Sequence, residues 1–172
     1  MCVTTLTNDF TRPCRKHGGV AEIKVRPWVE PTTAAGFALT ASLATLSGAA
    51  LAGWIKLYCD LKTSKAMSTG TTNRENGSFF WAQQVDWKYL DLPVELIEDM
   101  ADMMKNNVHV AVKTNEGKYY LFGYNYGMAY QGTFDTGAAL SDAVATTSTF
   151  VGEEINFPVY RISQTVYDLL DQ

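Results

Sequence analysis

The sequence predicts a mainly β protein, built as a β-sandwich or small barrel with one flanking α-helix and extended arms and loops. Three observations support this expectation. Aromatic residues make up 12% of the chain and charged residues only 19%, below the usual ~25%. Several short segments alternate apolar and polar residues, as half-buried strands do. One segment, near residues 93–107, repeats its apolar residues at clear helical spacing.

Residues 1–19 predict an irregular N-terminal arm, because Pro13 and the pair of Gly18 and Gly19 interrupt regular structure. We expect the rest, residues 20–172, to form a single β-rich domain. The chain is 47% hydrophobic, which is enough to bury a core. The first element of this domain is a strand that begins at Val20 and is closed by Pro27.

Residues 34–53 allow two predictions. Phe37, Leu39, Ala41 and Leu43 recur at period two, which favours a strand, whereas the many alanines between residues 34 and 46 favour a helix. Both alternatives stay open. The run 34–54 is long enough to cross a membrane, but it consists mostly of Ala, Thr, Ser and Gly, so we expect no membrane insertion. Residues 54–61 predict a further strand.

The polar, turn-rich run 62–77 predicts a mobile loop, after which residues 78–87 resume strand character. Pro93 suits the first position of the helix predicted over residues 93–107. Acidic residues occupy the solvated face of that helix, namely Glu95, Glu98, Asp99 and Asp102. Residues 108–114 and 118–124 straddle a short turn that contains Gly117, so they predict a β-hairpin.

No pattern in the chain indicates catalysis, and we expect neither an enzyme nor a bound cofactor. The sequence lacks the usual nucleophile, phosphate-loop and metalloprotease motifs. Cys14 and His17 form the only ligand-like spacing and are a weak candidate for a metal site. His109 alternates with valines in a predicted strand, which indicates a structural or surface histidine. The net charge of −4 argues against nucleic-acid binding.

Residues 117–158 combine aromatic strand-formers, glycines and a Ser/Thr/Ala-rich arm, with no group suited to bond breaking. This composition favours a protein that pairs with its neighbours. We expect Tyr119, Tyr120, Phe122 and Tyr124 to lie in the core or at an interface. Residues 132–147, beginning at Gly132, are the predicted assembly arm. Glu153 and Glu154 predict a charged rim or an intersubunit contact.

Two regions resemble structural proteins of tailed bacteriophages, particularly phages of Bacteroidetes hosts, including crAss-like phages. The first is residues 14–25, CRKHGGVAEIKV, where a Cys-containing arm precedes two glycines and a short strand. The second is residues 92–160, which follow a pattern of helix, strand, Asn-x-Gly-Lys turn and Tyr-Tyr-Leu-x-Gly strand. A Gly- and Thr-rich arm containing Gly132, Gly137 and Asp142 comes next, and Thr-x-Thr-Phe-x-Gly-Glu-Glu closes the pattern.

The resemblance implies a non-enzymatic virion protein, a subunit of tail-tube or neck/tail rings around the DNA channel. Its partners would be copies of itself and adjacent tail or neck proteins. DNA would pass through without being bound specifically, and no membrane would be involved. Localisation would be the virion, with assembly in the host cytoplasm. A head decoration or head–tail adaptor protein is the alternative. A small hydrolase or ligand-binding barrel around His109 and Asp86 is a third class.

Overall fold

The computed structural model describes residues 18–57, 59, 63–73, 75, 77–89, 94–135 and 145–170. The strands are β1 (Val20–Pro27), β2 (Phe37–Thr40), β3 (Leu43–Leu46), β4 (Ile55–Leu57), β5 (Lys65–Asn73), β6 (Ser78–Tyr89), β7 (Val108–Thr114), β8 (Tyr119–Phe122), β9 (Met128–Asp135), β10 (Ala145–Glu154) and β11 (Tyr160–Arg161). The helices are the 3₁₀-helix η1 (Gly48–Leu51), α1 (Val94–Lys105) and α2 (Gln164–Asp168). The predicted mainly β fold with a flanking helix is confirmed.

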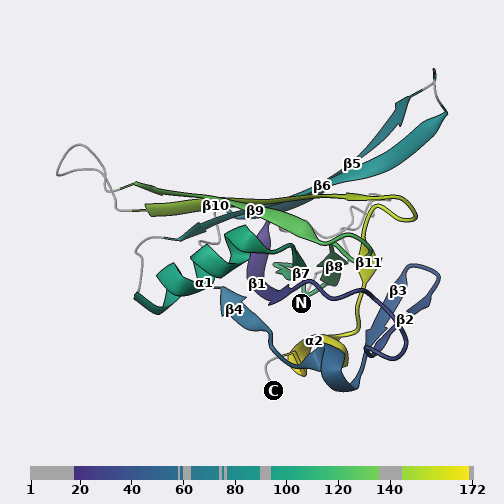
Figure 1. The fold of residues 1–172 in the computed structure, drawn as a ribbon, viewed down its shortest axis with the longest axis horizontal. Coiled ribbons are helices and arrows are strands. Elements are labelled where there is room, and N and C mark those ends of the chain that lie inside the picture. Colours follow the sequence, from purple (N-terminus) through teal and green to yellow (C-terminus); the bar gives the residue numbers. More distant parts are fainter. Residues whose placement is uncertain are drawn as a thin grey trace, which may run out of the picture.

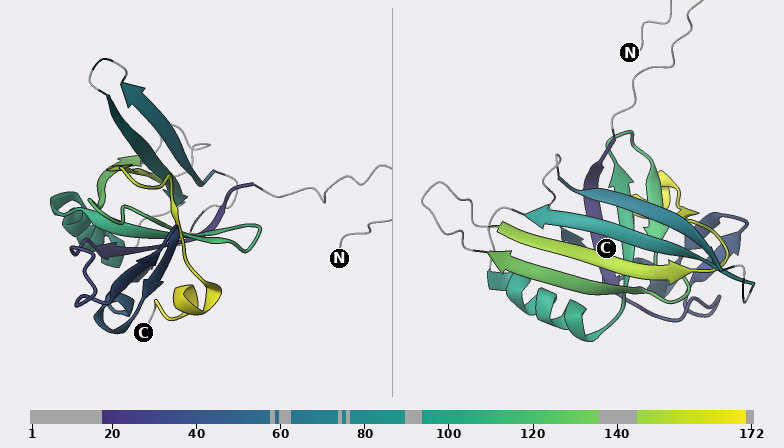
Figure 2. Two further views of the ribbon diagram at one scale, coloured as in Figure 1. Left: turned by 90° about the vertical axis from the view of Figure 1, so that its right-hand side faces the viewer. Right: turned by 90° about the horizontal axis from the view of Figure 1, so that it is seen from above.

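The strands form two layers that meet where β7 touches β9. One layer has the order β4-β1-β7-β8-β11-β3-β2, and the other has the order β9-β10-β6-β5. A single pair of residues, Val108 and Met128, joins the layers. The strands of the four-stranded layer run across those of the other layer, as Figures 1 and 2 show from two directions. Pairing is antiparallel throughout, except between β11 and β3.

The main core lies between the two layers. Trp87, Phe150 and Met128 from the four-stranded layer pack against Ile23, Val25 and Val110 from the other layer. The alternation of β6 and β10 explains this arrangement, because every second residue is buried over residues 83–87 of β6 and 146–150 of β10. Helix α1 closes one side of the sandwich beside β9 and contributes Met103 to the core.

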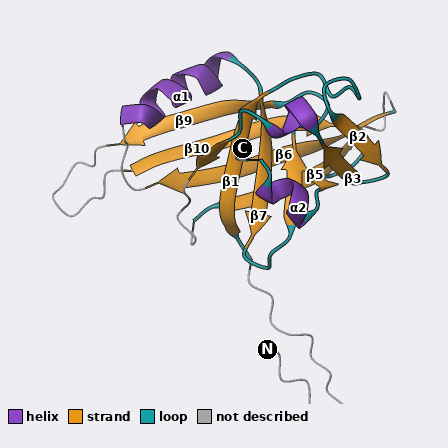
Figure 3. Cartoon of the chain, turned by 90° about the horizontal axis from the view of Figure 1, so that it is seen from below, coloured by secondary structure: helices purple, strands orange, loops and turns teal. Residues whose placement is uncertain are grey.

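A second core covers the opposite face of the β1/β7/β8 layer. Its residues include Phe37, Trp54, Leu121, Tyr160 and Leu170. Strand β7 therefore has both faces covered, and its residues 108–112 are all buried. Helix α2 lies below β1 and β7 in Figure 1 and faces the viewer in Figure 3, which is seen from below, and its Tyr167 and the adjacent Leu170 complete this second core.

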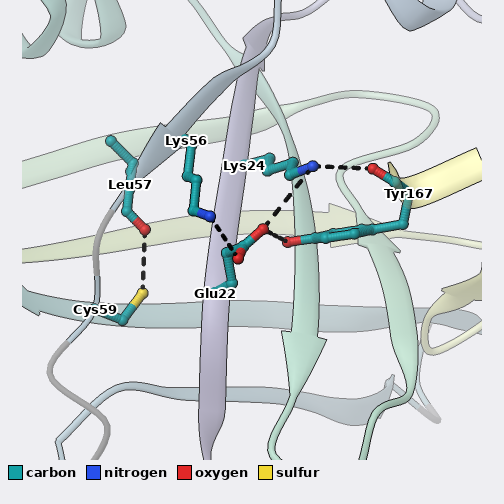
Figure 4. Close-up of polar contacts among 6 residues, drawn as sticks. All are labelled: Glu22, Lys24, Lys56, Leu57, Cys59 and Tyr167. Atoms are coloured by element: carbon teal, nitrogen blue, oxygen red, sulfur yellow. Dashed lines mark hydrogen bonds and ion pairs between the residues drawn. The ribbon is translucent and has the colours of Figure 1, made fainter. Parts of the chain in front are cut away.

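A buried lysine holds α2 against β1. Lys24 is 2% exposed, and its Nζ donates to the main-chain oxygen of Tyr167 at 3.0 Å while lying 4.3 Å from the centre of the Tyr167 ring. The Tyr167 hydroxyl donates to Glu22 at 3.1 Å, and Lys56 pairs with the same carboxylate at 2.8 Å. Figure 4 shows Glu22 between these two partners. The C-terminal element is thus attached by polar contacts as well as by apolar packing.

Most predicted elements are confirmed. The strand from Val20, the helix near 93–107 and the hairpin around Gly117 correspond to β1, α1 and the β7–β8 pair. The open question over residues 34–53 resolves as two short strands and η1. Helix α2, which is only five residues long, was not among the predicted elements. Among the described residues, no helix is long and apolar enough to span a bilayer.

One prediction is wrong. Most of the run predicted as a mobile loop, residues 62–77, is strand β5, which pairs with β6 from Lys65 to Asn73. Threonine is β-branched and suits a strand, so its polarity was misleading. The predicted assembly arm, residues 132–147, is strand at both ends, since Gly132 lies in β9 and residues 145–147 lie in β10, and its role in assembly stays a prediction. Its middle part, with Gly137 and Asp142, lies outside the described residues.

Candidate assembly surfaces

The four-stranded layer has two edges at which little strand pairing occurs. Strand β5 pairs with β6 and with no other strand in the described part of the chain. Strand β9 meets β7 only at Met128, so beyond this residue its pairing is with β10. Edge strands of soluble proteins usually carry lysine or proline, which discourage pairing with other chains. Strand β5 has Lys65 at its start and no further charged residue or proline along its nine residues.

The β5–β6 hairpin extends beyond both layers, as Figure 1 shows at its upper right. Three consecutive aromatic residues lie in this part of β6: Phe79, Phe80 and Trp81. Phe79 is 59% exposed. The Trp81 ring lies over Gly70 of β5, where an added Cβ would come within 2.7 Å of Trp81 Cζ3. A two-stranded ribbon is marginal on its own in water, so this extension is suited to lie against another molecule.

The outward face of the four-stranded layer is polar and lacks net positive charge. The burial alternation directs Asp86, Asp135 and Glu153 to this face, together with Lys65 and Lys88. Asp86 accepts from Gln84 at 2.7 Å and Thr149 at 3.0 Å, and it pairs with Lys65 at 3.2 Å. Burial alone raises the pKa of Asp86, but these hydrogen bonds outweigh it, so the pKa lies below its ordinary value.

The predicted aromatic residues of β8 are mainly core residues. Tyr119 and Phe122 are 9% and 4% exposed, Tyr120 is half-buried, and Tyr124 follows the strand at 4%. Tyr119 packs on Tyr167 with ring centres 4.9 Å apart, and Tyr124 packs on Tyr160 at 4.7 Å. Of the two roles predicted for these residues, the structure supports the core.

The two predicted rim glutamates differ. Glu153 is exposed, whereas Glu154 is fully buried. The Glu154 carboxylate accepts from the Asn125 main-chain N–H and from Asn125 Nδ2, both at 2.7 Å, and from the Tyr160 hydroxyl at 3.1 Å. Burial raises the pKa of Glu154, and burial together with this carboxylate raises the pKa of Tyr160 to about 12. Glu154 thus fastens the end of β10 to the β8–β9 connection within one subunit.

His109 is a buried core histidine. Its Nδ1 lies 2.9 Å from the Gly123 oxygen, and its Nε2 lies 3.0 Å from the Val29 oxygen. The ring packs on Phe37, with centres 5.0 Å apart. Burial, and to a smaller extent the charge of Arg26, lower the pKa of His109 to about 4, although both carbonyl contacts act to raise it.

His109 and Asp86, the residues considered for a hydrolase or ligand-binding site, do not share a pocket in the described part of the chain. Asp86 lies on the outward face of β6, in a hollow of about 530 Å³ whose lining does not include the buried His109. No group of three or more His, Cys, Asp or Glu among the described residues could hold a metal ion. Cys14 and His17, the weak metal candidate, lie outside those residues.

Comparisons with protein families, with curated proteins and with solved structures give no match for this chain.

Proposed function

We propose that this protein is a non-enzymatic structural subunit of a phage virion that assembles into tail-tube or neck/tail rings around a DNA channel. The observation that carries the proposal is the four-stranded layer, in which β5 pairs only with β6 among the described strands and β9 pairs with β7 only at Met128, with α1 beside it. A strand edge that is free on each side of one sheet can pair with the opposite edge of the next copy. Such head-to-tail contacts close into a ring when the rotation between copies allows it.

Closure of this kind removes the unpaired edges, as in a β-barrel. It also supplies a neighbour for the aromatic residues of the β5–β6 extension. The outward face of the sheet would then line the channel. With three acidic and two basic side chains on that face, including the Lys65–Asp86 pair, phosphate groups would find no cationic surface to hold them.

A head decoration or head–tail adaptor protein is the second candidate, since it would use the same exposed ribbon on a different partner. Cross-linking of the chain to a capsid protein, in place of cross-linking to itself, would favour it. No observation among the described residues favours the hydrolase or ligand-binding class.

The proposal is tested by placing charges on the β5 edge. In the double variant Thr69→Lys/Thr71→Lys, both lysines lie on an exposed edge strand, where like charges oppose strand pairing between copies. Thr147→Lys is the matched control, because Thr147 is exposed on the same face of the sheet but lies on the central strand β10.

Size-exclusion chromatography with multi-angle light scattering provides the measurement. We expect the wild type and Thr147→Lys to form ring-sized assemblies and the double variant to stay monomeric with an unchanged circular dichroism spectrum. A wild type that remains monomeric at high concentration, or a double variant that assembles normally, contradicts the proposal.

A further inference from the structure

A cavity of about 300 Å³ lies between α1 and the β1/β4 side of the sandwich. Asp99, Asp102, Met103 and Asn106 line it from the helix, and their spacing places them on one helical face. Val25, Pro27, Ile55 and Val108 line it from the strands. The floor is therefore apolar, formed by the buried side chains of Val25, Met103 and Val108, while two carboxylates stand at the rim.

The charges at this rim are not balanced within the subunit. Asp102 pairs with Lys105 at 3.0 Å, but both side chains are about 70% exposed, at 74% and 69%, and such a pair is weak. Asp99 has no ion pair with any described residue. Arg26 also lines the cavity, yet its guanidinium lies 6.0 Å from the centre of the Phe37 ring, which belongs to the second core.

An apolar floor with carboxylates at the rim fits a lysine or arginine side chain. The aliphatic stem of such a residue packs on apolar surface while its charged end stays at the edge. The chain carries one short basic segment, Arg12 to His17, in which Arg12, Arg15 and Lys16 are cationic. Residues 1–17 contain these three basic residues against the single acid Asp9, whereas the chain as a whole has a net charge of −4.

The reach of the chain decides which copy supplies Arg15 and Lys16. Asn115 Nδ2 donates to the Gly18 oxygen at 2.8 Å, which fixes Gly18 beside the β7–β8 turn. From Gly18 to Val25, at the cavity, the strand runs roughly 20 Å at ~3.3 Å per residue. Lys16 is only two residues from Gly18, so its main chain reaches at most about 7 Å from that point. Arg15 and Lys16 therefore cannot fill the cavity of their own subunit.

We propose that Arg15 or Lys16 of one copy docks into the α1/β1 cavity of a second copy, with its side chain packed on Val25, Met103 and Val108 and its charge beside Asp99 and Asp102. This inference rests on the proposed self-assembly, since it joins two copies of the chain. It adds a second contact that is separate from the β5 and β9 edges.

Carbodiimide coupling of the full-length chain tests the contact, because this reagent joins an amine to a carboxylate that touches it. Equal amounts of ¹⁴N- and ¹⁵N-labelled chain are mixed, allowed to assemble, coupled and digested for mass spectrometry. We expect Lys16 to be linked to Asp99 or Asp102, with peptides that combine both isotopes. Glu98→Gln is the control variant, since Glu98 is an exposed acid of α1 that does not line the cavity, and it should leave these links unchanged.

Charge reversal gives an independent measurement. Asp99→Lys/Asp102→Lys should weaken self-association by about tenfold, and the added changes Arg15→Glu/Lys16→Glu should restore it. Links between residues of the same isotope only would overturn the docking between copies, as would assembled material without any link from Lys16 to Asp99 or Asp102. Mixed-isotope links in a chain that forms no ring would instead support the docking and contradict the ring.

Discussion

At the scale of single residues, His109 is the clearest example of a side chain whose ionisation is coupled to folding. The imidazole is fully buried, and burial lowers its pKa from 6.5 to about 4. Arg26 is the charged group that adds to this effect. The neutral ring is therefore the form that fits the folded protein.

Protonation of His109 makes the free energy of unfolding depend on pH. In the unfolded chain the imidazole binds a proton near pH 6.5, whereas in the folded chain it does so only near pH 4. Its contribution to stability is complete above about pH 6.5 and is lost as the pH falls towards 4. We predict a loss of about 3 kcal/mol in unfolding free energy over this range. Urea titrations at several pH values measure it. His109→Gln should lose much less, and an equal loss in the variant would contradict the assignment.

Ala41 is a residue whose backbone conformation is strained. It stands in the tight β2–β3 turn with φ of 54°, the one positive value among described non-glycine residues. An L-residue with a side chain is disfavoured there, and glycine is not. We predict that Ala41→Gly stabilises the protein by about 0.5 kcal/mol, the relief of strain being partly offset by the greater freedom of glycine in the unfolded chain.

Ala38→Gly, in the adjacent strand β2, is the matched comparison. It should destabilise the protein by about 0.5–1 kcal/mol, because glycine weakens a regular strand. Thermal unfolding followed by circular dichroism measures both variants. A midpoint that falls for both would show that the turn at Ala41 is not strained.

At the scale of elements, β10 depends on the buried carboxylate at its end. The Glu154 carboxylate accepts three hydrogen bonds, two from Asn125 and one from Tyr160, and none of these donors carries a positive charge. In Glu154→Gln, an acceptor oxygen becomes a donating amide that faces other donors. Buried donors left without an acceptor cost about 1–3 kcal/mol, and we predict a destabilisation of that size.

Glu153→Gln is the control, because Glu153 is the neighbouring residue of the same strand and is exposed. It should change the unfolding free energy by less than about 0.5 kcal/mol. Denaturant unfolding of both variants provides the comparison. Equal effects at the two positions would refute the internal role of Glu154.

The elements with strong periodicity were predictable, and those defined by long-range packing were not. The apolar, β-branched and aromatic residues of β1, β7 and β8 and the helical spacing of α1 indicated these elements, although β7 is buried on both faces and its burial does not alternate. Strand β5 has few apolar residues, because it is an edge strand with β6 as its neighbour, and it therefore resembled a loop. Helix α2 has one local signal, the N-cap residue Ser163, whose hydroxyl accepts from the Val166 N–H at 3.2 Å, and its polar contacts with Lys24 and Glu22 come from more than 140 residues away.

At the candidate site, too, local sequence patterns were informative and long-range packing was not predictable. The aromatic residues of β8 were correctly singled out as core or interface residues, but only the packing of Tyr119 and Tyr124 identifies them as core. Glu153 and Glu154 are adjacent in the sequence and nothing in the sequence separates their roles. The open edges of β5 and β9 were not visible at all, since they depend on the order of strands in the sheet.

At the scale of the whole molecule, the proposed assembly uses two surfaces of the subunit. The first is the pair of strand edges in the four-stranded layer, with the aromatic ribbon that extends from it. The second is the cavity beside α1, with its carboxylate rim. In the proposed assembly each surface would join unlike parts of two copies, and contacts between unlike parts are the ones that build rings.

Cryo-electron microscopy of the purified, assembled chain tests this account most directly. We expect closed rings in which β5 of each copy lies beside β9 of the next and the face bearing Asp86 lines the channel. Single copies at high concentration, or rings in which both strand edges face the solvent, would contradict it.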